Sequence, residues 1–173
     1  DMQMCNLTEV NVSDITSQED LNNRVSAATL IGTLQASYTD FHYLRDTWRI
    51  NCEKDALLGV SMTGIASMEL FKYNIKEAAS VAMYTNESIA SRVGINKAAR
   101  VLTIKPAGTT SLVLGTSSGI HAWHDNYYWR RMRVSKNESI YKYLLDTNPT
   151  LIEDDYFNPT STPLIKLPQT APQ

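Results

Sequence analysis

The longest regular pattern in the sequence is a run of apolar residues that recur every three or four positions from Leu21 to Trp48. This spacing places apolar side chains on one face of a helix. Ser17 precedes the run and can cap the first turn of a helix. We therefore expect one long amphipathic helix, or two helices with a break near Gly32 or Ser37.

Further helices alternate with short strand-like runs that are rich in β-branched and other apolar residues. A helix is expected over residues 76–92, closed by Gly94, and shorter helices are expected to open at Ala66 and to cover residues 110–115 and 138–145. The strand-like runs lie at residues 5–12, 57–62, 99–105, 129–134 and 164–167. Strands separated by helices predict an α/β fold whose functional rim follows the carboxyl ends of the strands.

Length and charge restrict the class of protein. A chain of 173 residues with 43% apolar content can form a single domain over residues 1–173. The 16 basic and 18 acidic residues show no long block of one sign, which disfavours nucleic acid or an anionic membrane as a partner. We find no run of about 18 apolar residues and no signal-peptide layout, so a cytoplasmic protein without a membrane partner is expected.

The two ends of the sequence resemble interior positions of a longer chain. The first residue is not Met, and Cys5 stands at the start of a strand-like pattern. The last strand-like run is followed by only a few residues. We therefore expect this chain to be a fragment that has the remainder of the same polypeptide as a partner.

The segment IKPAGTTSLVLG, residues 104–115, is the clearest candidate for a binding site. It follows a predicted strand, and its hydroxyl residues lead into an apolar run. If a helix begins there, its first N–H groups have no partner within the helix and can hold an anion such as phosphate. The spacing is not that of a Walker A or a dinucleotide-binding loop. An ordinary capped strand-to-helix turn explains the same residues, and spacing alone does not choose between these two interpretations.

Four segments, in order, resemble the large catalytic subunit of ribonucleotide reductases. KPAGTTSLVLGTSSGIH resembles the substrate-phosphate loop of that family together with the segment that follows it. CNLTEVNV resembles the strand that bears one cysteine of the reducing dithiol, while LLGVSMTGIASM and IKLPQTAP resemble two other barrel segments. Gly108 and SSGIH look more like the adenosylcobalamin-dependent class II enzymes than like the iron-dependent ones.

The resemblance implies a fold and a set of functional residues. It implies that the chain is the C-terminal portion of a ten-stranded α/β barrel. It further implies that a phosphate loop holds the nucleotide and that Cys5 is one member of the redox-active dithiol, with its partner and the radical cysteine outside this chain. Apart from the resemblance, Cys5 is more typical of a small buried apolar residue. The residues that match the phosphate loop are Pro106, Ala107, Gly108, Thr109, Thr110 and Ser111.

The same resemblance implies the cofactor and the partners. Adenosylcobalamin would bind mostly outside this chain, the substrate would be a ribonucleoside di- or triphosphate, and a thioredoxin-like protein would be the reductant. A non-catalytic nucleotide- or phosphate-binding module and the large subunit of an iron-dependent reductase remain alternatives.

Two further groups of residues suggest chemistry less strongly. His121 and His124 with Asp125 have the spacing H-x-x-H-D, which is not that of a zincin helix, and no third ligand is evident nearby, so we expect surface histidines and no metal site. Cys52 matches no cysteine of the family and is expected to be structural. The run YYWRRMR, residues 127–133, is explained equally well by a nucleotide-stacking patch or by a solvated strand edge whose aromatic side chains turn into the core.

Overall fold

The computed structural model describes residues 2–172, and their contacts fall into two compact units. The first unit extends to Ala122 and the second begins at Trp123. The sequence predicts a single domain over residues 1–173, whereas the contacts within the chain separate these two units. Each unit is described by itself below.

The first unit is built on two parallel strands, β1 (Asn6–Asn11) and β2 (Leu58–Thr63). Their register pairs Asn6 with Leu58 and Asn11 with Thr63. The expected third strand, residues 99–105, is reduced to a parallel bridge between Leu102 and Val60, flanked by backbone hydrogen bonds. Pro106 lacks an N–H group and therefore cannot continue such a ladder. The order across this sheet is β1, β2 and then the segment around Leu102.

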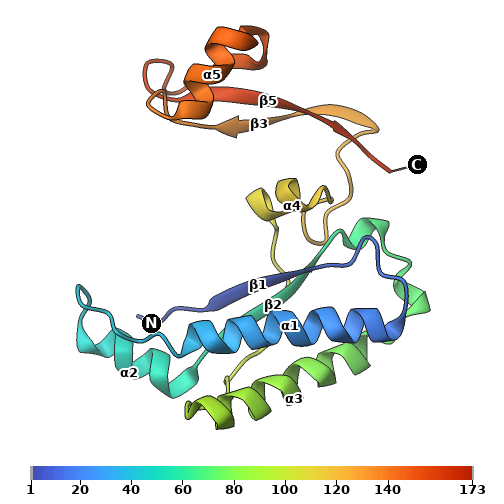
Figure 1. Cartoon of the computed structure of the whole chain (residues 1–173), viewed down its shortest axis with the longest axis vertical. Helices are drawn as coiled ribbons and strands as arrows, with labels where there is room; N and C mark the ends of the chain where they lie inside the picture. Colours follow the sequence, from blue (N-terminus) through green and yellow to red (C-terminus); the bar gives the residue numbers. More distant parts are fainter. Residues whose placement is uncertain (1, 173) are drawn as a thin grey trace. The chain divides into compact units, whose positions relative to one another are not determined.

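Helices cover one face of this sheet. The expected long helix is divided into α1 (Gln18–Ala36) and α2 (Asp46–Asp55), and α3 (Ile75–Val93) packs against α1 (Figure 1). The helix expected at Ala66 is only a single 3₁₀ turn, η1 (Ile65–Ser67), which is followed by η2 (Leu70–Lys72). A short helix, α4 (Gly108–Leu114), covers most of the segment predicted at 110–115.

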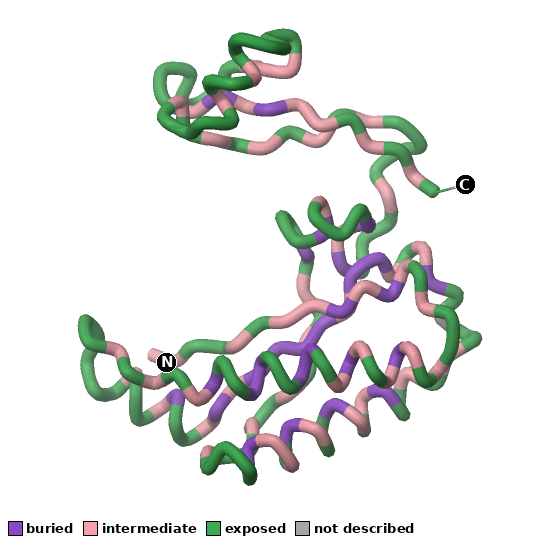
Figure 2. The backbone as a smooth tube through the Cα atoms, in the orientation of Figure 1, coloured by how far each residue is buried: buried purple, intermediate pink, exposed green. Residues whose placement is uncertain are grey.

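The core of the first unit lies between the sheet and α1. Val10 and Val60 of the strands, with Val12 just after β1, meet Leu21 and Val25 of α1, and all five are buried. Burying one such side chain stabilises the fold by about 1.5–3 kcal/mol. β2 is the most continuously buried strand because it has a neighbour on each edge (Figure 2).

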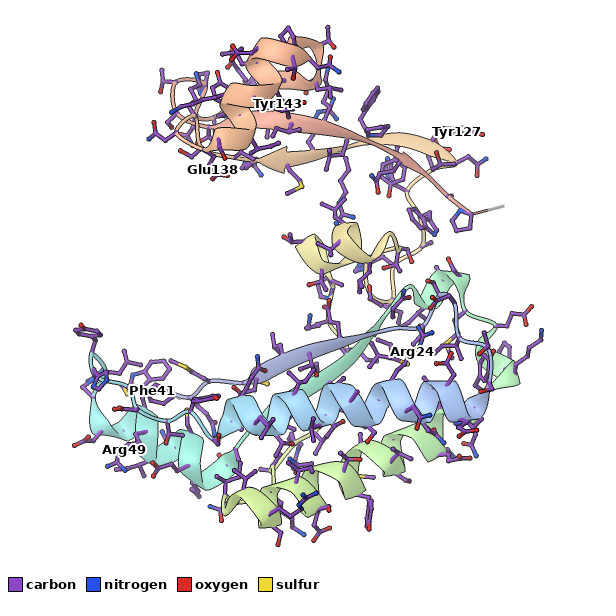
Figure 3. The ribbon with its side chains drawn as sticks, in the orientation of Figure 1. Arg24, Phe41, Arg49, Tyr127, Glu138 and Tyr143 are labelled. Carbon is purple, nitrogen blue, oxygen red and sulfur yellow. The ribbon has the colours of Figure 1, made fainter. Side chains whose placement is uncertain are left out.

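Capping residues set the ends of the helices. The Ser17 side chain accepts a hydrogen bond from the Asp20 N–H at 3.0 Å, as the sequence predicts, and Gly94 closes α3 with a φ of 82°. Arg24 of α1 forms ion pairs with Asp14 at 2.6 Å and Asp20 at 2.8 Å (Figure 3). The hydrogen bond from Arg24 lowers the pKa of Asp20, so this carboxylate stays charged beside the positive end of the helix.

The second unit is a three-stranded antiparallel sheet with one helix. Its strand order is β3 (Tyr127–Arg133), β5 (Pro163–Thr170) and β4 (Ile152–Asp154). The helix α5 (Ser139–Thr147) and the 3₁₀ turn η3 (Pro149–Leu151) connect β3 to β4. The sequence predicts β3, α5 and β5 with shifted bounds, and β4 is not predicted.

Ion pairs run across this second sheet. Arg131 and Lys166 both contact Glu153, at 2.7 and 3.4 Å, and Arg133 contacts Asp155 at 2.8 Å. Burial alone would raise the pKa of Asp155, but hydrogen bonds from two backbone N–H groups and from Arg133 lower it. Two arginines of the YYWRRMR run are therefore engaged by carboxylates, as on a strand edge. Tyr127 and Trp129 are exposed, so the expectation that the aromatic side chains turn into the core is wrong for these two residues.

No helix within residues 2–172 has the length and apolar content needed to cross a membrane.

Candidate active site

The predicted phosphate turn lies where α4 begins. Ala107 is the residue before the helix and is buried, whereas Gly108, Thr109 and Thr110 are exposed. Within residues 2–172, no carbonyl accepts a hydrogen bond from the N–H of Thr109 or Thr110. A Cβ added at Gly108 would meet no atom within 4 Å, so this stretch of backbone opens onto space. The turn therefore presents amide donors and hydroxyl groups at one exposed place.

The inner side of the turn is anchored by Ser111. Its side chain donates to the Gly108 carbonyl at 3.0 Å, and its own carbonyl accepts from the Thr116 N–H at 2.9 Å. Ser111 is fully buried. Its hydroxyl therefore stabilises the turn from within.

The segment after α4 is tied to the end of β2. The buried Thr63 hydroxyl donates to the Ser117 carbonyl and accepts from the Gly119 N–H, both at 3.0 Å. The Gly64 N–H donates to the Ser117 carbonyl at 3.2 Å. These bonds hold SSGIH, one of the motifs behind the family resemblance, against the carboxyl end of β2.

Gly119 allows the SSGIH segment to pack against Lys105 and Pro106, where the chain enters the phosphate turn. It has a φ of 59°, and a Cβ at this position would lie 2.3 Å from the Lys105 carbonyl oxygen and 3.3 Å from the Pro106 Cα. Only glycine combines this conformation with such a close backbone approach. The two parts of the motif, separated by α4 in the sequence, therefore form one structure.

Cys5 lies elsewhere on the same sheet. It directly precedes β1, at the amino end of the strands, and a Cβ added at Gly59 would lie 3.3 Å from the Cys5 Sγ. Cys5 is classed as exposed, yet partial burial raises the pKa of its thiol. Cys5 is therefore not next to the turn. The two lie toward opposite ends of the six-residue strand β1, which is about 20 Å long.

Cys52 has the structural role that the sequence predicts. It is buried in α2, and its sulfur accepts a hydrogen bond from the Met4 N–H at 3.3 Å. This contact anchors the backbone just before Cys5.

The face of the sheet opposite the helices carries small and polar side chains. Gly59, Ser61 and Thr63 are buried residues of β2, and register pairs Leu7 with Gly59 and Glu9 with Ser61. Glu9 forms an ion pair with Lys105, the residue before Pro106. This face therefore contains a charged pair between Cys5 at one end and the turn at the other.

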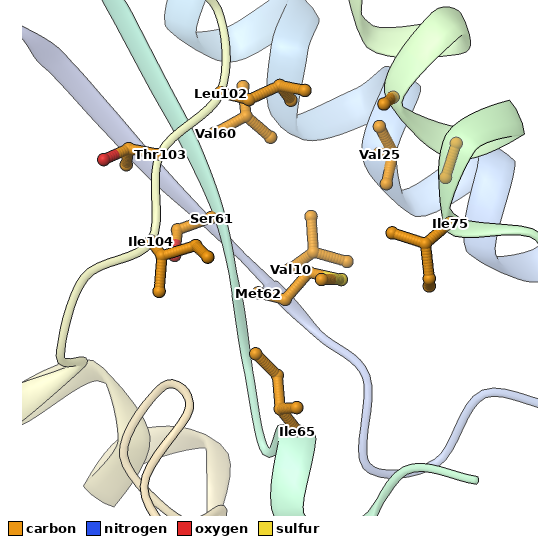
Figure 4. Close-up of a pocket in the computed structure, with 12 residues that line it drawn as sticks. Val10, Val25, Val60, Ser61, Met62, Ile65, Ile75, Leu102, Thr103 and Ile104 are labelled. Atoms are coloured by element: carbon orange, nitrogen blue, oxygen red, sulfur yellow. The ribbon is translucent and has the colours of Figure 1, made fainter. Parts of the chain in front are cut away.

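The helix-covered face has a different character. A cavity of about 540 Å³ lies there, lined mainly by aliphatic side chains that include Val10, Val25, Val60, Ile75 and Leu102 (Figure 4). It offers an anion no charged or amide side chain. We therefore place the candidate site on the opposite face, with Cys5, Glu9 and Lys105.

Across residues 2–172, no group of three or more His, Cys, Asp or Glu side chains is close enough to hold a metal ion. His121 Nδ1 lies 3.0 Å from the Ser118 carbonyl, and the His124 ring makes an edge contact with Tyr128.

Comparison with known proteins adds a family context to this geometry. No protein-family model matches the chain. An adenosylcobalamin-dependent ribonucleoside-triphosphate reductase from Euglena gracilis is 24% identical over 179 residues, covering 98% of this chain and 24% of that protein. A probable enzyme of the same description from Dictyostelium discoideum is 30% identical over 105 residues, covering 57% of this chain and 13% of that protein.

A solved structure matches as well. The crystal structure of a B12-dependent (class II) ribonucleotide reductase aligns with 98% of this chain and 28% of its own, with a TM-score of 0.69 and 19% identity. This chain resembles the cobalamin-dependent ribonucleotide reductases. The family resemblance drawn from the sequence is thereby confirmed, and the mixed α/β fold is shared with the class II reductase structure. The chain spans about a quarter or less of the length of the two curated reductases.

The helix-covered cavity is not suited to the cofactor named for these relatives. A corrin carries many amide groups that need polar partners, whereas the cavity in Figure 4 is lined mainly by aliphatic side chains. The residues that line this cavity therefore do not fit adenosylcobalamin.

Sequence reasoning missed two features of the reductase-like site. The Glu9–Lys105 pair joins residues 96 positions apart, and Thr63 contacts residues 54 and 56 positions away. One signal was available for the pair, since Glu9 is the one charged residue of the strand-like run 5–12 and Lys105 is the last residue of the run 99–105. Only the register of the sheet shows that they share a face.

Proposed function

We propose that this chain is part of the catalytic barrel of a cobalamin-dependent ribonucleotide reductase, which converts ribonucleotides to deoxyribonucleotides by radical chemistry. The exposed backbone at Gly108–Thr110, anchored by Ser111 and by the SSGIH segment, carries the proposal. The names of the relatives and the shared fold support it. A complete ten-stranded barrel and a cytoplasmic location are parts of this proposal.

The turn from Pro106 to Ser111 binds the substrate phosphates. The N–H groups of Thr109 and Thr110 and their hydroxyls donate to phosphate oxygens, while Ser111 holds the turn from within. Fixing the phosphates orients the ribose without contact at the reacting carbon, which is how remote binding energy serves catalysis. The substrate is a ribonucleoside di- or triphosphate.

Cys5 is one member of the reducing dithiol, and the second thiol lies outside this chain. The ribose C2′–O bond breaks, a C2′–H bond forms, and the hydroxyl leaves as water. The two thiols together lose two electrons and become a disulfide, which a thioredoxin-like dithiol reduces by exchange. Adenosylcobalamin, which would bind mostly outside this chain, would supply the radical that initiates this chemistry.

The structure sets a condition on substrate orientation. Because Cys5 and the turn lie at opposite ends of β1, a nucleotide held at the turn must point its ribose along the face that carries Glu9. The remainder of the polypeptide closes this face in the barrel.

The test is deoxynucleotide formation by the intact protein, with and without added adenosylcobalamin. We expect product only with the cofactor, and we expect Cys5→Ser to abolish turnover with a thioredoxin-like reductant while leaving nucleotide affinity unchanged. Cys52→Ser is the matched control and should keep turnover, since Cys52 is buried on a helix.

Two outcomes would contradict the proposal in different ways. Nucleotide binding without any product would favour a non-catalytic phosphate-binding module. Turnover that does not depend on added adenosylcobalamin but requires a separate radical-generating subunit would favour the iron-dependent class.

A further inference from the structure

We propose that Glu9 and Lys105 are positioning residues that join the strand bearing Cys5 to the phosphate turn. This inference rests on the proposed function. Lys105 immediately precedes Pro106, and Glu9 lies four residues after Cys5 on β1. Their ion pair is a direct side-chain link between these two parts of the candidate site.

The pair crosses the central strand of the sheet. Glu9 is the register partner of Ser61 on one edge of β2, while Lys105 follows the segment that pairs with Val60 on the other edge. Adjacent strands are about 4.8 Å apart, so the two side chains bridge roughly two strand spacings. The register partner of Glu9 on β2 is Ser61, which has a small side chain, while the space over Gly59 is filled by Leu7, Thr103 and Cys5.

The pair is shielded from water. The Glu9 side chain is 5% exposed and the Lys105 side chain 22% exposed, whereas Lys97 and Glu87 form a comparable pair at 68% and 63%. Charges in a shielded site are screened less by salt and depend more on each other than charges at a surface. Removing one partner of the shielded pair therefore leaves a poorly solvated charge beside the turn.

One carboxylate oxygen of Glu9 makes no hydrogen bond within residues 2–172 that would stabilise the fold. Within residues 2–172, Glu9 Oε2 is buried and has no hydrogen-bond partner, although Oε1 contacts Lys105. Buried polar atoms normally have partners, and a half-satisfied carboxylate is costly for a fold. A functional role explains why Glu9 is nevertheless found on the face shared by Cys5 and the turn. Its carboxylate holds Lys105, and with it the backbone that leads into Pro106.

Lys105 is also held from the other side. Its carbonyl oxygen lies 2.3 Å from where a Gly119 Cβ would be, so the SSGIH segment packs directly on its backbone. The side chain of Lys105 is fixed by Glu9 while its backbone is confined by Gly119. The residue that enters the phosphate turn is thus restrained at both ends.

The experiment is a double-mutant cycle in the intact reductase with Glu9→Gln, Lys105→Met and the two combined. We expect each single change to lower kcat/KM for the nucleotide by about tenfold to a hundredfold, because small misplacement of a substrate anchor has effects of this size. We expect the combined variant to lose much less than the product of the single losses. Lys105→Arg should retain most activity because it keeps the charge.

The control is the exposed pair, changed to Glu87→Gln and Lys97→Met, which should leave kcat/KM within about twofold because surface pairs contribute little. Nucleotide affinity measured by equilibrium binding should fall in parallel with kcat/KM in the Glu9 and Lys105 variants. Should Glu9→Gln fail to fold, Glu9→Asp with Lys105→Met completes the cycle.

Independent, multiplicative losses, or full activity in both single variants, would overturn the role of the pair while leaving the reductase assignment intact. A wild-type protein that binds no nucleotide and forms no deoxynucleotide would overturn the proposed function itself.

Discussion

The Cys5 thiol sits in an environment that favours its protonated form. Partial burial raises its pKa above the usual value for cysteine. At neutral pH the group is therefore a thiol, and in the proposed reduction it would supply one of the two electrons and one of the two protons that the dithiol provides. Because the pKa is higher in the folded state, this group contributes stability below its unfolded pKa, and that contribution is lost as pH rises through the folded value.

Site-resolved alkylation of Cys5 as a function of pH tests this environment. We expect the rate to rise with pH to a midpoint above that of the same cysteine in the chain unfolded by urea, because only the thiolate reacts. Mass spectrometry separates Cys5 from the buried Cys52. A midpoint equal to or below that of the unfolded chain would show that the thiol is solvated or paired with a cation.

At the scale of elements, the end of β2 organises the candidate site. Thr63 uses one hydroxyl group to hold both Ser117 and Gly119, so the strand fixes a segment that is more than 50 residues away in sequence. That segment in turn packs on Lys105 and Pro106. β2 thus positions the phosphate turn, although the two are far apart in the sequence.

Replacing Thr63 by Val keeps the shape of the side chain and removes both hydrogen bonds. We expect the free energy of unfolding to fall by about 1–3 kcal/mol, because a buried N–H and a buried carbonyl lose a partner. Nucleotide affinity should fall with it. Urea unfolding and equilibrium nucleotide binding of the intact protein measure the two effects.

Thr63→Ser is the matched control, since it retains the hydroxyl and loses one methyl group, worth about 1 kcal/mol. We expect it to preserve nucleotide affinity. Equal losses of affinity in the two variants would mean that packing at this position, rather than hydrogen bonding, positions the turn.

Element prediction succeeded where local chemistry decides the outcome. Ser17 and Gly94 end their helices as the sequence predicts, because caps depend on neighbouring residues alone. The break in the long helical pattern falls at Ser37, not at Gly32. A Cβ at Gly32 would lie 3.5 Å from Leu58 and Thr8 side-chain atoms, in ordinary van der Waals contact, so this glycine lies where α1 packs on the sheet and the helix continues through it. That placement depends on tertiary contacts that no local pattern contains.

For the whole chain, the α/β class and the order of the main elements follow from sequence, whereas the division into two units does not. The alternation of strands and helices carries no information about which strands pair. β3, β4 and β5 pair only with one another, and β1 pairs only with β2 among the named strands. The first sheet ends at the segment around Leu102, and that side chain is 44% exposed. A strand from elsewhere in a longer polypeptide would pair at such an edge, as the proposed barrel requires.

In the candidate site, too, some features could be predicted from the sequence and others could not. The turn at 106–111 and Cys5 could be chosen from motifs, but their separation by the length of β1 depends on strand register. The Glu9–Lys105 pair between them could not be chosen, because it requires knowing that residues on two edges of β2 share a face.

A structure of the intact protein with a bound ribonucleotide tests the central claim most directly. The account predicts phosphate oxygens about 2.7–3.2 Å from the backbone nitrogens of Thr109 and Thr110, with the ribose extending along the sheet face toward Cys5. A nucleotide whose phosphates lie away from this turn, or on the helix-covered face of the sheet, would contradict it.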